Sequence, residues 1–147
     1  MFERILSLLS PGQSEPNPLP EPDARMALGA LLVRVAMADE IYLFEEIEQI
    51  DRILASAYDM SALDAARLRA TAEKLNTAAA GHTTEELASL IRAAVDYDHR
   101  LETVAALWRV VQADGFTHDS EAQLVSLVQQ QLGVSQEDSD AARNAVA

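Results

Sequence analysis

The chain has 147 residues, of which 49% are hydrophobic and only 5% aromatic, and it contains no cysteine. This length and composition favour one helical domain and exclude disulfides, thiolate zinc sites and cysteine nucleophiles. The 24 acidic and 11 basic residues give a net charge of −13, which repels phosphate backbones and argues against nucleic-acid binding.

The first 22 residues differ from the rest of the chain. Residues 1–10 form a short amphipathic segment, and residues 11–22 contain all five prolines, which predicts an extended linker. The first segment carries Glu3 and Arg4 and is too short and too mixed for a signal peptide. No apolar run approaches the roughly 20 residues of a transmembrane helix. We therefore expect a soluble, cytoplasmic protein whose domain covers residues 23–147.

Helical periodicity and helix-start signals continue through residues 23–147. Asp23 can cap a first helix that carries Leu28, Leu32 and Val35 on one face. Further start and stop signals are the pairs Ser61–Asp64, Thr83–Glu86 and Ser135–Asp138, the expected cap Asp98, and the glycines Gly81 and Gly133. The expected helices cover residues 23–37, 43–58, 61–79, 83–95, 98–112 and 118–132, with a short last helix after residue 135.

Two parts of the chain resemble each other. Residues 31–50 (LLVRVAMADEIYLFEEIEQI) align with residues 106–125 (ALWRVVQADGFTHDSEAQLV), and both contain Ala-Asp followed by six residues and a Glu. The matched charged residues are Arg34, Asp39 and Glu46 in the first part and Arg109, Asp114 and Glu121 in the second. This pattern predicts an internal duplication of helix–turn–helix repeats, about residues 24–70 and 99–147, related by a pseudo-twofold axis.

The four repeated acids lie in phase with apolar helix faces. Asp39 continues the stripe of Leu28, Leu32 and Val35, and Glu46 shares a stripe with Ile50. Asp114 and Glu121 hold the same phase in the second repeat. A carboxylate at the edge of a core costs several kcal/mol unless it is hydrogen-bonded, paired, protonated or bound to a metal.

Several interpretations of these acids are open. Each Asp can cap the turn, and each Glu can sit in a first helical turn that the helix dipole favours. Arg34 and Arg109 can be ion-pair partners of the acids. Alternatively, each Asp and Glu can converge on a hard divalent cation.

The second turn is the better cation candidate. Gly115 allows a tight backbone after Asp114, and His118 lies three residues before Glu121, on the same helix face. A histidine ligand would favour zinc or another transition metal. The alternative for His118 is a solvent-exposed residue near the start of a helix.

The paired Ala-Asp turns, the duplication and the closing stretch LGVSQEDSDAAR resemble the tellurite-resistance TerB family over about residues 24–147. The resemblance implies an all-α, compact bundle of about seven or eight helices and a role in stress responses such as tellurite resistance. It also implies acidic positions that hold divalent cations, here Asp39, Glu46, Asp114 and Glu121. The first site departs from the family at Glu40, where glycine is usual.

No nucleophile elbow, phosphate-cradling glycine loop or Ser/His/Asp set stands out, so we expect no enzymatic activity. The sequence predicts a TerB-like protein that binds a divalent cation (Ca, Mg, Mn or Zn) or acts as an acidic interaction module. The metal candidates are Asp39, Glu46, Asp114, Glu121 and His118. The alternative is a metal-free scaffolding bundle that binds a protein partner; an unidentified partner and a homodimer both stay open.

Overall fold

The computed structural model describes residues 23–38, 41–77, 82–115 and 118–146. Within these ranges the chain forms seven α-helices and no strand, which confirms the predicted all-α class. The helices are α2 (Ala24–Ala36), α3 (Phe44–Tyr58), α4 (Ala62–Thr77), α5 (Thr84–Ala94), α6 (Tyr97–Val111), α7 (Asp119–Gln131) and α8 (Gln136–Val146). The N-terminal segment 1–10, the linker 11–22 and Gly81 lie outside the described residues, so the predictions for them stay predictions.

Most helix starts follow the capping signals of the sequence. Asp23 Oδ1 accepts a hydrogen bond from the Met26 amide at 2.9 Å, and Thr83 Oγ1 accepts one from the Glu86 amide at 3.0 Å. Ser61 and Ser135 cap α4 and α8 in the same way. At the end of α7, Gly133 adopts a φ of 71°, a left-handed conformation that a side chain would strain.

The start of α6 corrects the prediction that Asp98 is its cap. Asp96 is the cap, because its Oδ1 accepts a hydrogen bond from the His99 amide at 3.0 Å. Asp98 lies in the first turn, where the helix dipole favours an acid. Tyr97 anchors this earlier start, since its hydroxyl donates to Asp138 Oδ2 at 2.6 Å on α8. That tertiary contact selects between two aspartates that are equally good caps by sequence.

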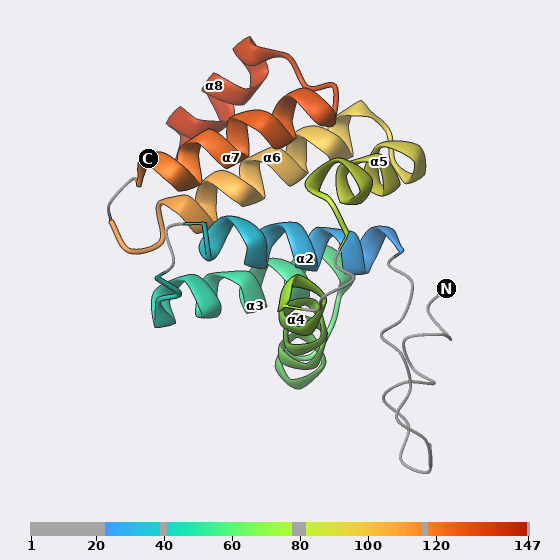
Figure 1. Cartoon of the computed structure of the whole chain (residues 1–147), viewed down its shortest axis with the longest axis vertical. Coiled ribbons are helices and arrows are strands. Elements are labelled where there is room, and N and C mark those ends of the chain that lie inside the picture. The colour runs from blue at the N-terminus through green and yellow to red at the C-terminus, as the bar shows by residue number, and fades with distance from the viewer. Residues whose placement is uncertain (1–22, 39–40, 78–81, 116–117, 147) are drawn as a thin grey trace.

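Helix α2 is the centre of the bundle. It contacts α3, α4, α5, α6 and α7, and Figure 1 shows it running through the middle of the molecule. Leu28, Leu32 and Val35 are buried as predicted, but so are Leu31 and Val33 on other faces. The predicted single stripe therefore understates the burial of a helix that is covered on nearly all sides.

The remaining helices form layers on α2. In Figure 1, α3 and α4 lie on one side of α2, and α6 and α7 lie on the other with α8 outermost. Trp108 of α6 is buried, and its indole donates to Ser139 Oγ of α8 at 3.2 Å. Among the described helices, none has the length and apolar character that a membrane crossing requires.

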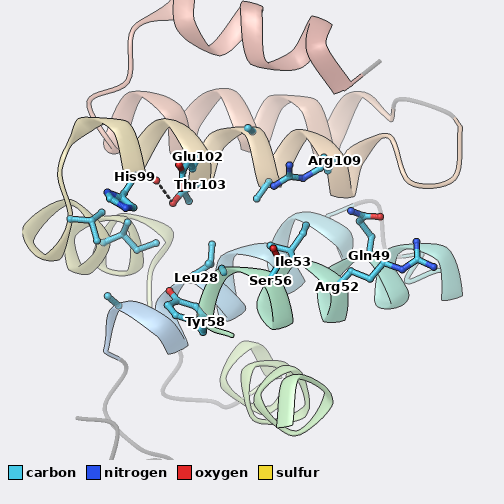
Figure 2. A pocket seen from close by; sticks show the side chains of 16 residues that line it. Leu28, Gln49, Arg52, Ile53, Ser56, Tyr58, His99, Glu102, Thr103 and Arg109 are labelled. Carbon is cyan, nitrogen blue, oxygen red and sulfur yellow. Dashed lines mark hydrogen bonds between the residues drawn. The ribbon is translucent and has the colours of Figure 1, made fainter. Parts of the chain in front are cut away.

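The duplicated sequences form two corresponding helix pairs, α2 with α3 and α6 with α7. In Figures 1 and 2 the C-terminal ends of α2 and α6 lie at the same end of the molecule. The starts of α3 and α7 lie there too. The fold therefore brings the facing ends of both helix pairs to one end of the bundle.

Candidate functional site

The turn between α6 and α7 joins two of the predicted site residues. After α6 ends, Gly115 adopts a φ of 82°, and its amide donates to the carbonyl of Gln112 at 3.0 Å. His118 is the N-terminal cap residue of α7, and its Nε2 lies 3.0 Å from Oδ2 of Asp114. His118 is half-buried, so it is not the freely exposed residue of the alternative interpretation. The imidazole and the carboxylate together close the turn.

Glu121 lies in the first turn of α7 and is fully buried, at 0% exposure. Val125 and Val128 continue the same face, and both are buried. The predicted phase of this acid is therefore confirmed. Its position in the first helical turn is one that the helix dipole favours, and the carboxylate lies in a region where charge is costly without compensation.

In the first repeat, the matching acid Glu46 lies in the first turn of α3 and is 2% exposed. Its Oε1 accepts a hydrogen bond from the backbone amide of Leu43, the cap residue of α3, at 3.1 Å. This bond is the glutamate half of a capping box, so Glu46 stabilises the start of α3 without a metal. Asp39 and Glu40 lie outside the described residues, and the predictions about them stay predictions.

Neither repeated arginine forms an ion pair with a described member of the repeated acids, and Asp39 lies outside the described residues. Arg34 donates to Asn76 Oδ1 at 2.7 Å and to Thr84 Oγ1 at 3.2 Å, which ties α2 to α4 and α5. Arg109 is exposed on α6 and forms none of the ion pairs of the described residues. Equivalent sequence positions therefore have different roles, because the two repeats pack against different neighbours.

Within the described residues, no group of three or more His, Cys, Asp or Glu side chains is arranged to hold a metal ion. The structure brings Asp114 and His118 into contact, and it places Glu121 one turn away on α7. The metal-binding role of all five candidate residues stays a prediction.

Sequence reasoning missed a groove of about 710 Å³ between α3 and α6. Figure 2 shows its two walls, with Arg52 and Gln49 on α3 facing a wall of α6 that carries His99, Glu102 and Arg109. Leu28 of α2 and Ile91 of α5 also line it. Its lining comes from two pairs of consecutive helices, α2 with α3 and α5 with α6, and no single helical periodicity indicates such an assembly.

At one end of the groove, His99 is paired with the cap of α6. Its Nδ1 lies 2.6 Å from Oδ1 of Asp96, and this hydrogen bond and the carboxylate charge raise the pKa of His99 above its ordinary value. Protonated His99 is therefore favoured in the folded protein. Its small contribution to stability is complete below the unfolded-state pKa and is lost as the pH rises through the raised pKa.

We expect Asp96→Asn to lower the pKa of His99, because asparagine still caps the helix but carries no charge. The measurement is a pH titration of the histidine ring resonances by NMR. Asp64→Asn, on α4 and away from His99, removes the same charge and is the control. An unchanged His99 titration in Asp96→Asn contradicts the pairing.

Comparison with known proteins identifies the family. The family model described as tellurite resistance protein TerB matches residues 25–144, which is most of the chain. No curated protein and no solved structure matches significantly. The matched range includes both Ala-Asp motifs, the starts of the six described helices that follow α2, and nearly all residues that line the groove between α3 and α6. The chain therefore belongs to the family of the tellurite resistance protein TerB.

Proposed function

We propose that this TerB-family protein is a non-enzymatic binder of a divalent cation, and that the turn between α6 and α7 is the site. Asp114, His118 and Glu121 would supply the ligands, and because these three side chains are not gathered into a ligand group in the structure, the turn would have to rearrange on binding. The observation that carries the proposal is the full burial of the Glu121 carboxylate one turn from the Asp114–His118 pair. A cation there would interact with a carboxylate that the fold has removed from water, where the attraction between opposite charges is stronger than in solvent.

The donor set decides which ions suit the turn. The carboxylates of Asp114 and Glu121 are hard oxygen ligands of the kind that calcium, magnesium and manganese prefer. The imidazole of His118 suits zinc and other transition metals. Because a histidine ligand must be neutral and a carboxylate ionised, the affinity is expected to fall at acid pH. The proposed biological setting, a stress response such as tellurite resistance, rests on family membership.

Calorimetric titration of chelator-treated protein with calcium, magnesium, manganese and zinc tests this proposal. We expect at least one ion to bind with a Kd below about 1 mM, a standard free energy more favourable than about −4.1 kcal/mol. Asp114→Asn and Glu121→Gln should each weaken that affinity about tenfold or more. Glu45→Gln removes an equal charge from an exposed position and should leave the affinity unchanged.

Two results would contradict the cation proposal. One is the absence of any binding below millimolar concentration, and the other is an affinity that both site variants leave intact. A thermal melt of apo Glu121→Gln separates the alternatives further. If the carboxylate is uncompensated without metal, the variant melts higher than the apo wild type; if it is a satisfied cap, the variant melts lower.

A metal-free interaction role is the second candidate, and the turn between α2 and α3 supports it. There Glu46 is hydrogen-bonded to the Leu43 amide, and next to it Ile41 and Phe44 are 53% and 71% exposed. Large exposed apolar side chains of this kind are typical of contact surfaces. Sedimentation of the wild type and of Phe44→Glu tests the homodimer. A wild type that is a dimer together with a monomeric Phe44→Glu supports this role. A monomer in both proteins excludes self-association.

A further inference from the structure

The lining of the groove between α3 and α6 contains more basic than acidic side chains. The charged residues that line it are Arg52, His99 and Arg109 against Glu102. Glu48 and Asp96, which are not among the lining residues, are paired with Arg52 and His99, so Arg109 is the lining cation without an ion pair among the described residues. Arg52 and Arg109 come from opposite walls, as Figure 2 shows. A guanidinium group at the wall of a cavity is a suitable recognition site for an anionic group.

Both arginines are available to a ligand. Arg109 forms none of the hydrogen bonds or ion pairs that link the described side chains, whereas Arg34, its counterpart in the first repeat, is held between α4 and α5. Arg52 pairs with Glu48 one turn earlier on its own helix, and its side chain is largely exposed. An exposed pair of this type contributes about 0.3–0.5 kcal/mol, so a ligand can displace it at little cost.

The floor of the groove is apolar. Leu28, Ile53 and Ile91 present buried side chains to it, and the small residues Ala57 and Ala106 leave space above them. The volume of about 710 Å³ lies within the range of about 300–1,000 Å³ that is common for small-molecule sites. The groove therefore combines an apolar floor with cationic groups on its walls.

We propose that this groove binds a small amphipathic anion, a carboxylate with an alkyl chain. Its head group would pair with Arg109, and its chain would lie over Leu28, Ile53 and Ile91. A polyanion such as a nucleic acid is disfavoured, because the net charge of −13 repels it over the Debye length of about 8 Å. A single charge on an apolar body meets little of that repulsion. No lining residue is a cation candidate, so this proposal is independent of the proposed function.

Calorimetry with three probes tests the chemical class. We expect decanoate, used below its micellar concentration, to bind one molecule per chain. Acetate, which has the head group alone, and decyltrimethylammonium, which has a chain of the same length with the opposite charge, should each bind at least about tenfold more weakly. Failure of decanoate to bind, or equal binding of the cationic probe, overturns the proposal.

Matched variants locate the binding. Arg109→Gln should weaken decanoate binding about tenfold, the typical consequence of losing one charge-assisted hydrogen bond. Arg67→Gln, on the exposed surface of α4 outside the groove, makes the same change in net charge and should have no effect. Ala57→Trp, at an exposed position that lines the groove, should block binding by filling it. Circular dichroism confirms that the variants keep their helices. An equal loss of decanoate affinity in Arg109→Gln and Arg67→Gln overturns the proposal. Unchanged decanoate binding by Ala57→Trp overturns it as well.

Discussion

Trp108→Ala is expected to lower the free energy of unfolding by about 3–5 kcal/mol, a large part of the roughly 5–15 kcal/mol of an ordinary domain. Trp108 is 2% exposed, and its indole both fills the space between α6 and α8 and donates to Ser139 Oγ. Arg143 of α8 also lies over the ring, at 4.5 Å from its centroid. The variant leaves a cavity and removes all three contacts.

Helix α8 should respond first to this substitution. Ser139 is the only fully buried residue of α8, so the helix depends on its contacts with α6. Urea unfolding measures the loss of stability, and hydrogen exchange shows whether the amides of α8 lose protection before those of α2. Leu127→Ala removes an exposed apolar side chain of α7 and should change stability by less than about 0.5 kcal/mol. If Trp108→Ala loses as little unfolding free energy as Leu127→Ala, the packing role of the indole is contradicted.

Arg34→Ala is expected to cost about 2–3 kcal/mol of unfolding free energy. The guanidinium donates to Asn76 and Thr84, and Asn76 in turn donates to the carbonyl of Ala30 at 3.0 Å. Burial lowers the pKa of Arg34, which is the sign of a cation partly removed from water and dependent on these partners. Without it, the Asn76 oxygen loses its donor and α5 loses a link to α2.

The duplication supplies the control for this experiment. Arg109→Ala changes the same residue type at the equivalent position and alters the net charge equally, but Arg109 is exposed on α6. We expect it to change stability by less than about 0.5 kcal/mol. Urea unfolding of both variants under one set of conditions gives the comparison. Equal effects of the two substitutions would show that bulk charge, and not the hydrogen bonds of Arg34, determines the result.

Part of the candidate site was predictable from residue phase. Glu46 and Glu121 share helical stripes with apolar residues, and both are buried. Helical spacing is a local property, so the sequence alone indicates which face of α3 or α7 an acid occupies. Helical spacing does not indicate the hydrogen-bond partner of each acid. Glu46 accepts a bond from the Leu43 amide, while Asp114 meets His118, and the shared motif does not distinguish these arrangements.

The repeated arginines show the limit of arguments from internal symmetry. Arg34 and Arg109 align, yet α2 is enclosed by five helices while the corresponding face of α6 borders an open groove. The choice of Asp96 over Asp98 as the cap of α6 has the same origin, because a contact between Tyr97 and Asp138 sets the helix start. In both cases a distant segment determines the role of a residue.

The sequence by itself determined the helical class, the order of the helices, the duplicated turns and the phase of their acids. These features depend on spacing, capping and composition over a few turns of chain. Only the tertiary structure decided that α2 is central, that the two arginines diverge, and that α2, α3, α5 and α6 form a cationic groove. The physical reason is that burial and cavity shape depend on which helices meet, and such contacts join residues that no local pattern connects.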